Sequence, residues 1–400
     1  MTVPRHRASR RALAAGLAAA GLTLGSVLAA PVATSMAAHA DTFVGITITG
    51  STQMQTLGQL LAKQYQNLHP NVHITVNATS SADGFSETCG NNTQLGMSDN
   101  YIQDDQLRSP NCGDMVGIPV AVSATTLVYN LPGAAFNQRS SGDNFTLVHP
   151  LRFDAKTVAD IYMGNVTTWN DPEIKRLNPG VKLPDQTIQV YNSAEPGGAG
   201  FVFNQWLAQS VPMWNSTVGV TIQPLWPRGH SVGQPTAGAM VQAIQSTPYS
   251  MGFAGFDFAI SNHMQAAALK NAAGVYQTPL LNGVSHAIGK ALKKGFASDF
   301  RTPFVTIADP DAFNPACLEF FVVHSNLKVA NPSAAAASAN QATKAFLQWA
   351  ISSSGGQAYI EAIEFRKYGK ANKSELAHGF VPVPDALRLT IQSKVDGINA

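Results

Sequence analysis

The stretch FVGITITGSTQMQTLGQLLAKQYQNLHPNVHITV, which spans residues 43–76, decides the fold class. It opens with β-branched and apolar residues that predict a strand over 43–49. Residues 53–68 predict an amphipathic helix, and residues 72–76 predict a second strand. The apolar face of the helix is formed by Leu57, Leu60, Leu61, Tyr65 and Leu68. A strand, a helix and a strand in this order are typical of an α/β fold.

The same alternation continues along the rest of the chain. Further strands are predicted over 120–129, 188–191 and 320–323, and further helices over 154–163, 201–209 and 342–351. The Ala/Ser tract at 333–339 is compatible with either a loop or the start of a helix. The alternation predicts an α/β fold with a largely parallel sheet.

The composition excludes several classes of protein. Of the 400 residues, 45% are hydrophobic, which is enough for a sizeable core and excludes wholesale disorder. Only 12% are charged, so Asn, Gln, Ser and Thr must supply much of the polar surface. The formal net charge is +2, but after the four arginines of the first 40 residues are removed, 22 basic residues face 24 acidic ones, a net of −2. This balance argues against a nucleic-acid-binding protein, which needs a basic surface.

Residues 1–40 have the features of an export signal. A cluster of arginines precedes an apolar stretch over 12–30, and Ala38-His39-Ala40 fits a cleavage site. The pair Arg10-Arg11 leaves open whether export follows the general or the twin-arginine route. No cysteine lies near the cleavage site and no later segment is long and apolar enough to cross a membrane. We therefore expect an exported protein, periplasmic, extracellular or wall-associated, without a lipid anchor or a transmembrane helix.

Export to an oxidising compartment permits disulfide bonds. Cys89 and Cys112 lie in one polar stretch, and a bridge between them would stabilise the fold by about 3 kcal/mol. Cys317 adjoins a strand-like run and is expected to be buried and inert. With three cysteines one stays unpaired, and the sequence leaves open which one. Their spacing matches no zinc site.

Three junctions between a predicted strand and a predicted helix are candidate anion sites. Free backbone N–H groups and the helix dipole favour an anion at such a place. Alternatively, their Ser, Thr and Gly residues only cap helices and form turns. The junctions are Gly50-Ser51-Thr52, Ser80-Ser81-Ala82-Asp83-Gly84 and Glu195-Pro196-Gly197-Gly198-Ala199-Gly200.

Ten sequence motifs follow one another along the chain in an order that is specific to one protein family. The most specific is FDAKTVADIYMGNVTTWNDPEIKRLNPGVKLP at 153–184. The others, in matching order along the chain, are ITGST at 48–52, HPNVHITV at 69–76, SSADGF at 80–85, LGMSDN at 95–100, VYNLPG at 128–133, LWP at 225–227, SMGFAGFDFA at 250–259, FLQWAISSSGGQ at 346–357 and GFVPVPDAL at 379–387. In sequence and order these motifs resemble those of the periplasmic phosphate-binding proteins that serve phosphate ABC transporters. The resemblance covers nearly all of the chain after residue 40.

This resemblance implies a two-lobed periplasmic-binding-protein-like fold of type II, an α/β fold with central mixed sheets and a hinge. One domain would comprise residues 41–124 plus 306–400 and the other residues 125–305. The implied ligand is inorganic phosphate or a related small ligand, held in the cleft between the domains. The implied partners are the membrane subunits of an ABC permease, the protein being a monomer without cofactor or metal.

The resemblance also carries over site residues. Thr52 and the backbone of Gln53 would meet the ligand at the first junction, and Ser81 would donate to it at the second. Asp99 would accept a hydrogen bond from a protonated phosphate. It would disfavour sulfate, which has no proton to donate. Backbone N–H groups at the third junction would complete the site, contributed by Gly197, Gly198 and Ala199.

The third junction departs from the family pattern Arg-Ser-Asp-Gly-Ser-Gly-Thr-Thr. Alignment back from residues 201–203 places Ser193 where the arginine stands and Glu195 where its aspartate partner stands, with Gly197 and Ala199 in place of hydroxyl residues. Loss of a buried cation that pairs with an anion costs about 2–5 kcal/mol. Arg228 replaces that cation if its loop enters the cleft, and otherwise it is a surface arginine. A neutral or less charged small ligand is therefore an alternative to phosphate.

The leading functional prediction is a solute-binding protein that closes over its ligand for an ABC transporter. An alternative is a secreted or wall-associated protein that keeps the fold but has lost phosphate transport. A third hypothesis, a phosphatase-like enzyme, finds no nucleophile motif in the sequence, and the histidines show no ligand spacing. The binding hypothesis requires that the helix ends at the three junctions meet and leave room for a ligand.

Overall fold

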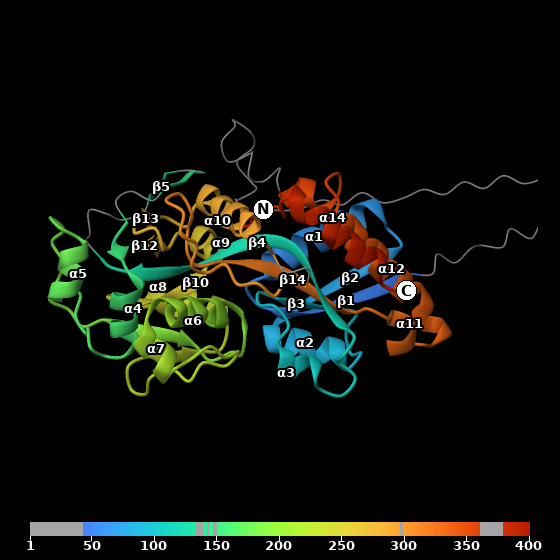
Figure 1. Cartoon of the computed structure of the whole chain (residues 1–400), viewed down its shortest axis with the longest axis horizontal. Helices are drawn as coiled ribbons and strands as arrows, with labels where there is room; N and C mark the ends of the chain where they lie inside the picture. The colour runs from blue at the N-terminus through green and yellow to red at the C-terminus, as the bar shows by residue number, and fades with distance from the viewer. Residues whose placement is uncertain (1–42, 133–138, 142–143, 147–149, 297–298, 361–378) are drawn as a thin grey trace, which may run out of the picture. The chain divides into compact units, whose positions relative to one another are not determined.

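The computed structural model describes residues 43–132, 139–141, 144–146, 150–296, 299–360 and 379–400. Within these residues a mixed sheet of nine strands organises the chain, in the order β2-β1-β3-β14-β4-β10-β8-β9, with β11 paired to β4 (Figure 1). The strands of this sheet are β1 (Val44–Ser51), β2 (Val72–Thr79), β3 (Leu95–Ser98), β4 (Met115–Asn130), β8 (Gln189–Ser193), β9 (Val232–Gln234), β10 (Ser250–Gly255), β11 (Gln265–Ala266) and β14 (Ala316–His324). The predicted export segment lies outside the described residues.

Two smaller sheets and the helices complete the described fold. The smaller sheets contain β5 (Arg139–Ser141) with β6 (Asn144–Thr146), and β7 (Arg152–Phe153) with β12 (Ala268–Lys270) and β13 (Tyr276–Gln277). The helices are α1 (Gln55–Leu68), α2 (Ser81–Cys89), α3 (Asp104–Leu107), α4 (Ala155–Tyr162), α5 (Pro172–Leu177), α6 (Gly198–Ser210), α7 (Pro212–Thr217), α8 (Ala237–Ser246), α9 (Phe256–Ser261), α10 (Leu281–Lys293), α11 (Leu327–Ala330), α12 (Ala334–Ile351) and α14 (Asp385–Asp396). Each strand and helix named from the sequence is therefore confirmed, with shifts at its ends.

The direction of the central strands differs from the sequence prediction of a largely parallel sheet. β1 is parallel to β2 and β3, and β8 is parallel to β9 and β10. At the centre, however, β14 is antiparallel to both β3 and β4, and β4 is antiparallel to β10. The alternation of helices and strands reports only how neighbours in sequence are arranged. It does not predict the direction of β14, because this strand pairs with strands that precede it by about 190 residues or more, as in the pair Ala124 and Ala316.

Strand β4 changes partner halfway along its length. Its residues up to Ala124 pair with β14, and those from Thr125 onward pair with β10. Figure 1 shows β4 and β14 extending from the region of β1, β2 and β3 to the region of β10. The change of partner falls at the predicted boundary between residues 124 and 125. The division into two domains itself stays a prediction, and residues Thr42–Ala400 form one compact unit.

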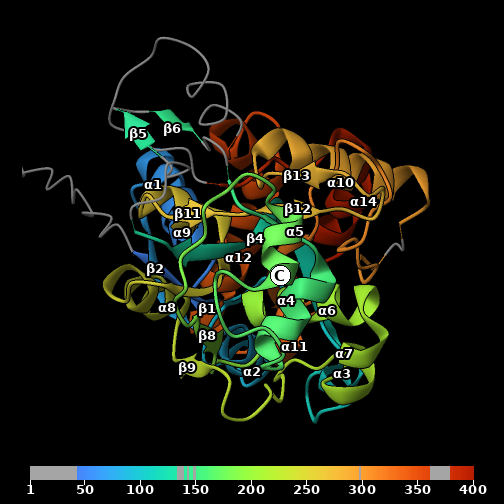
Figure 2. The same ribbon diagram turned by 90° about the vertical axis from the view of Figure 1, so that its left-hand side faces the viewer.

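Helices pack against both ends of this sheet. α2 packs against β1, β3 and β14, while α12 packs against β1 and α14. Figure 1 shows α2 on the opposite side of these strands from α14. At the other end α8 and α6 pack against β10, and Figure 2 shows α4, α5 and α6 at the end of the molecule that it turns toward the viewer.

An aromatic cluster fixes α6 against β10. Phe203 of α6 stacks on Phe253 of β10 with ring centroids 4.5 Å apart. Tyr162, Trp214 and Trp226 pack around this pair. Because these rings are largely buried, they set the position of α6, whose first turn carries the third junction.

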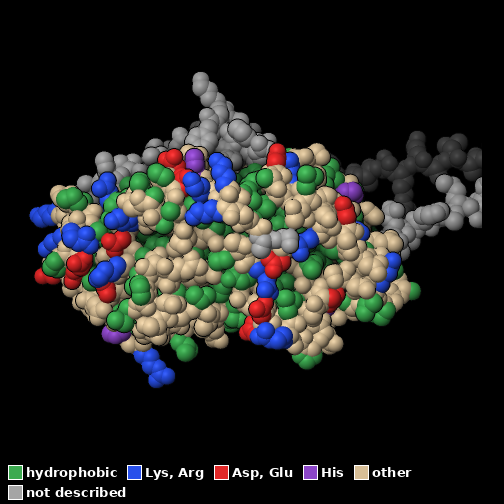
Figure 3. Space-filling view, viewed as in Figure 1, with side chains coloured by type: hydrophobic (Ala, Val, Ile, Leu, Met, Phe, Trp, Pro, Cys, Tyr) green, Lys and Arg blue, Asp and Glu red, His purple; other side chains and the backbone are tan. Residues whose placement is uncertain are grey.

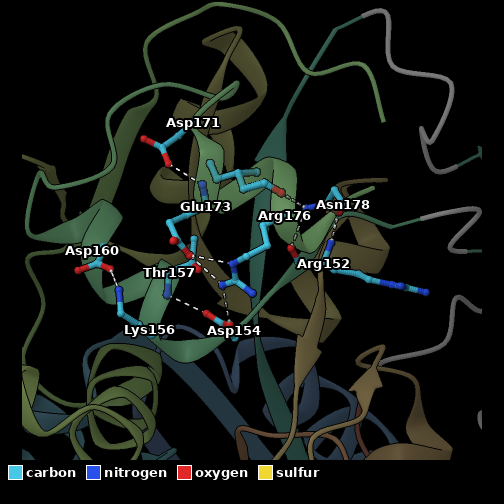
Figure 4. A network of polar contacts seen from close by, with 10 residues as sticks. Arg152, Asp154, Lys156, Thr157, Asp160, Asp171, Glu173, Arg176 and Asn178 are labelled. Carbon is cyan, nitrogen blue, oxygen red and sulfur yellow. Dashed lines mark hydrogen bonds and ion pairs between the residues drawn. The ribbon is translucent and has the colours of Figure 1, made fainter. Parts of the chain in front are cut away.

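The family-specific stretch 153–184 folds through local polar contacts (Figure 4). Asp154 caps α4 by accepting a hydrogen bond from the Thr157 N–H at 2.9 Å. Arg176 of α5 pairs with Glu173 at 2.8 Å. Asn178 clamps β7, accepting from the Arg152 N–H at 2.7 Å and donating to its carbonyl at 3.0 Å. These contacts hold the stretch together locally and do not involve the three junctions.

Two expectations about cysteines and membranes can be compared with the described residues. Cys89 and Cys112 form a disulfide, which confirms that pairing, and Cys317 is a buried free thiol. No helix among the described residues is long and apolar enough to cross a membrane. Figure 3 shows a surface dominated by uncharged polar and apolar atoms, as the low content of charged residues predicts.

Candidate functional site

The three junctions meet at two carboxyl groups. The first junction ends β1 with Ser51, whose hydroxyl accepts the Gln53 N–H at 3.1 Å. The next residue, Thr52, donates its hydroxyl to a carboxyl oxygen of Glu195 at 3.1 Å and accepts the N–H of Ala237, the first residue of α8, at 3.3 Å. The first and third junctions are thus in direct contact.

The second junction contributes Ser81, the first residue of α2. Ser80 caps this helix by accepting the Asp83 N–H at 3.0 Å, which leaves the Ser81 hydroxyl free to point elsewhere. That hydroxyl donates to Oδ1 of Asp99, the residue that follows β3. Gly50 permits this close approach of β1, α2 and β3, because a Cβ there would lie 2.2 Å from the Met97 carbonyl oxygen.

The third junction begins α6 beside the same carboxyl. Gly197 and Gly198 adopt positive φ angles of 80° and 65°, and the Gly198 N–H donates to the Asn100 side chain at 3.2 Å. A Cβ on Gly198 would lie 3.1 Å from Oδ2 of Asp99. The Ala199 amide also faces this carboxyl and lowers its pKa. Asp99 therefore sits between the N-terminal ends of α2 and α6.

Two further buried carboxyls lie on elements around this site. Asp257 is in the first turn of α9, and its Oδ1 lies near the Gln53 side chain, since both would contact a Cβ placed on Gly255. Glu319 lies in β14 and accepts a hydrogen bond from Ser123 of β4. Asp99, Asp257 and Glu319 are at most 3% exposed, and Glu195 is partly buried.

Burial raises the pKa of all four carboxyls. Burial and then the charge of Asp99 raise the pKa of Glu195 to about 8, against the opposing hydrogen bond from Thr52. Burial also raises the pKa of Asp99, and it raises the pKa values of Asp257 and Glu319 well above their usual range. In the described part of the chain no lysine, arginine or histidine forms an ion pair with any of them. The cost of burying these carboxyls is therefore offset by protonation, by hydrogen-bond donors and by helix dipoles.

Several buried polar atoms near the site have no hydrogen-bond partner among the described residues. A hydrogen-bonding ligand could satisfy such atoms, and burying them without a partner is costly. Those in the site are both side-chain polar atoms of the Gln53 amide and Oδ2 of Asp99. Three more unpartnered atoms lie on the central strands, namely Oε2 of Glu319 in β14 and the hydroxyls of Thr125 and Thr126 in β4.

A small cavity adjoins Asp99 on the side of Tyr101, Phe201 and Cys317 and measures about 20 Å³. That is roughly the room of one water molecule and less than an oxyanion needs. None of the other predicted ligand residues lines this cavity. The helix ends meet, as the binding hypothesis requires, and a ligand at the Thr52 hydroxyl must share that hydroxyl with Glu195 or displace Glu195 from it.

The site residues named from the sequence divide into two groups. The structure brings seven of them together: Thr52, Gln53, Ser81, Asp99, Gly197, Gly198 and Ala199. It does not bring Arg228 to this place, because that side chain is exposed and is not among the principal causes of the pKa shifts of Asp99 or Glu195. The ligand-binding roles of the seven residues stay predictions.

Sequence reasoning missed the wider acid cluster. Asp257 and Glu319 come from segments that look like ordinary core. The signal available was a single acidic residue inside an apolar run, in ACLEFFVV and in GFDFA. An acid in such a place is rarely there for packing alone.

Comparisons with known proteins agree with this architecture. A profile of the PBP superfamily domain matches residues 29–354. A phosphate-binding protein of Methanocaldococcus jannaschii is 27% identical over 251 residues, which cover 61% of this chain and 61% of that protein, less than two thirds of its length. A phosphate-binding protein of Mycobacterium bovis is 25% identical over 361 residues, which cover 87% of this chain and 85% of that protein.

A solved structure extends the comparison to the fold. The ancestral soluble variant of the human phosphate-binding protein superposes with a TM-score of 0.60 at 17% identity, covering 87% of this chain and 93% of that one. An identity this low supports the fold alone. With the profile covering most of its length, the chain belongs to the PBP superfamily and is a relative of the phosphate-binding proteins.

Proposed function

We propose that this protein is an exported solute-binding protein that captures inorganic phosphate, or a closely related small oxyanion, for an ABC transporter. The observation that carries the proposal is the convergence of donors from three separate segments on two carboxyl groups. Ser81 donates to Asp99, the Ala199 amide faces Asp99, and Thr52 donates to Glu195.

The carboxyl groups occupy the place in which an oxyanion would be bound. A carboxyl group presents oxygen acceptors to hydroxyls and helix N-termini just as a phosphate does. When a phosphate enters, its oxygens take over the donors that now face Glu195. Asp99 then accepts the remaining proton of the phosphate, which supplies the preference for phosphate over sulfate.

Capture requires the site to open, and the sheet offers the place for it. Strand β4 exchanges β14 for β10 between Ala124 and Thr125, next to the site. We place the hinge there, with one domain formed by residues 41–124 plus 306–400 and the other by residues 125–305. Opening along this line separates Thr52 and Ser81 from Glu195 and Gly198, which belong to the second domain.

The protein is proposed to bind and release its ligand unchanged rather than to act on it. The relatives carry the name of binding proteins. Their permeases are the proposed partners, and the proposed location is outside the cytoplasmic membrane after removal of residues 1–40. Arg228 has no place in this proposal, because its side chain is exposed.

A second candidate is favoured by the acidity of the site. Four carboxyls with which no described basic side chain pairs suit a neutral or less charged ligand. A protein with such a ligand would be a secreted or wall-associated protein that has lost phosphate transport. The ligand series in the experiment below separates the two candidates.

Calorimetric titration of the protein with phosphate, arsenate and sulfate tests the proposal. We expect one site per chain, with phosphate and arsenate bound more tightly than sulfate. Ser81→Ala is expected to weaken phosphate binding about 10- to 100-fold, since hydrogen bonds to charged groups contribute about 1.5–3 kcal/mol. Ser86→Ala, on the exposed side of the same helix, is the matched control and should bind like the wild type. Phosphate binding that is absent, or equal in Ser81→Ala and Ser86→Ala, would contradict the proposal.

A further inference from the structure

The Glu195 carboxyl lies where the first and third junctions touch. Its carboxyl accepts the Thr52 hydroxyl at 3.1 Å and 3.4 Å through its two oxygens, at the point where the first and third junctions touch. An oxyanion that uses the Thr52 hydroxyl must therefore lie against Glu195 or displace it. The protonation state of this one carboxyl decides whether that contact is attractive or repulsive.

Among the residues that the structure describes, the charged groups that act on Glu195 are acidic. Asp99, after β3, and Asp83, in the first turn of α2, both raise the pKa of Glu195 by their charge. From the remaining packed elements α6, α8 and β9 contribute no ionisable side chain at all. The loop that follows α7 touches the third junction through the Ile222 carbonyl and strand β8 through Trp226. Its ionisable side chains, Arg228 and His230, are exposed.

Within the described ranges no basic side chain pairs with these carboxyls or is placed to neutralise an anion beside them. What the site offers instead is the N-terminal ends of α2 and α6 and unpartnered buried atoms, among them Oδ2 of Asp99, which faces Gly198. Helix dipoles favour one added anion, but not an anion together with two ionised carboxylates. Charge balance therefore requires a proton on at least one carboxyl when the ligand is bound.

We propose that Glu195 binds the oxyanion as a neutral acid and donates its O–H to it, so that capture above neutral pH takes up one proton from solvent and release returns it. This inference rests on the proposed function and names the residue that selects the ionic form of the ligand. An ionised Glu195 repels the anion, and a protonated Glu195 adds a donor beside Thr52. The high pKa of Glu195 places the change within reach of ordinary buffers.

The test compares the wild type with Glu195→Gln, which keeps the size and a donor group of the side chain but carries no ionisable proton. Phosphate is titrated calorimetrically in buffers of different ionisation enthalpy at about pH 6 and about pH 9, on either side of neutrality. Phosphate itself gains or loses protons when it binds, and this contribution is the same for both proteins. Subtracting the proton uptake of the variant from that of the wild type therefore leaves the contribution of Glu195. Glu173→Gln is the matched control, because Glu173 is an exposed carboxyl in the α5 ion pair.

We expect the wild type to take up about one proton more than Glu195→Gln at about pH 9 and about the same number at about pH 6. Its affinity should fall about tenfold per pH unit above the pKa of Glu195, relative to the variant. Binding by the variant alone at about pH 9, with both proteins binding at about pH 6, also supports the inference. Glu173→Gln should match the wild type throughout.

The outcomes that overturn the inference are distinct from those that overturn the function. Phosphate binding with no difference in proton uptake at about pH 9 removes the role of Glu195 and leaves the function standing. Absence of binding to phosphate, arsenate and sulfate by both proteins at both pH values overturns the function and the inference with it. Carboxyl ¹³C NMR of the wild type provides a reading that needs no folded variant: a Glu195 carboxyl that is ionised in the phosphate-bound protein contradicts the inference.

Discussion

The hydroxyl of Thr52 donates to the carboxyl of Glu195 across 143 residues of sequence, at 3.1 Å. This contact joins the end of β1 to the start of α6, and it is where the structure brings two of the three predicted anion sites together. The Thr52 hydroxyl, which we expected to donate to a bound anion, donates instead to the carboxyl of Glu195.

Removing the Thr52 hydroxyl tests that contact. Thr52→Val should weaken phosphate binding about tenfold, the value of one hydrogen bond of about 1.4 kcal/mol. It should also raise the pKa of Glu195 further, since the Thr52 hydrogen bond lowers it. Calorimetry and a pH titration of the variant measure both effects. Thr52→Ser, which keeps the hydroxyl, should have the phosphate affinity and the Glu195 pKa of the wild type. A Thr52→Ser protein that binds phosphate as weakly as Thr52→Val would count against the contact.

Stability should fall as the pH rises through the range in which Glu195 holds its proton only in the folded chain. That range extends from the ordinary pKa of 4.5 to about 8. The folded state binds more protons than the unfolded state there, so unfolding releases a proton and is favoured by higher pH. Asp99, Asp257 and Glu319 act in the same direction, because their pKa values are also raised.

Chemical denaturation at a series of pH values measures this effect. Glu195→Gln should reduce the slope of unfolding free energy against pH by at most about 1.4 kcal/mol per unit, the contribution of one proton. A wild type whose stability increases steadily from about pH 5 to about pH 8 would show that these acids are ionised in the folded state.

Gly198→Ala should damage the site more than the fold. The φ angle of 65° is strained for alanine, and its Cβ would lie 3.1 Å from Oδ2 of Asp99. We expect a loss of about 1 kcal/mol of stability and the loss of measurable phosphate binding. Gly238→Ala, in α8 with its nearest neighbour 3.8 Å away, is the control and should bind normally. Equal binding by both variants would place the ligand elsewhere.

Asp99→Asn should narrow the preference for phosphate over sulfate. An amide can donate to sulfate, whereas the carboxylate requires a proton from its ligand. The ratio of the two affinities should fall about tenfold or more, equivalent to about 1.4 kcal/mol. Competition between the two anions measures the ratio directly, and an unchanged ratio would remove Asp99 from the discrimination.

The Cys89–Cys112 bridge should stabilise the chain by about 3 kcal/mol, because it closes a loop with a sequence separation of 23. Cys89→Ser with Cys112→Ser should lower the unfolding free energy by that amount. Cys317→Ala serves as the control, since a protein that contains only the bridged pair should still respond to reductant. A reductant effect on the double variant would show that the stabilisation has another source.

The sequence predicted those parts of the fold that depend on neighbouring residues. The strand, helix and strand over 43–76 follow from spacing alone, and Ser80 caps α2 where its motif indicates. The helix predicted from residue 201 starts three residues earlier, at Gly198, with Gly197 as its N-cap. The open Ala/Ser tract at 333–339 contains the start of a helix, α12, capped by Ser333.

The remainder depends on pairing between distant segments. The antiparallel course of β14 beside β4 decides that Glu319 and Ser123 meet, and no local pattern contains that register. The same holds for Gln53 and Asp257, which approach each other through Gly255. The strand-to-helix pattern located the three junctions and the family resemblance added Asp99, but neither located Asp257 or Glu319. The exposed position of Arg228 likewise depends on the path of a loop.

A structure of the protein crystallised with phosphate tests the central claim most directly. The account predicts one phosphate within hydrogen-bond distance of the Thr52 and Ser81 hydroxyls and the amides of Gly198 and Ala199, with Glu195 turned to donate to it. A phosphate bound away from these groups, or crystals in which Glu195 keeps its contact with Thr52 at saturating phosphate, would contradict it.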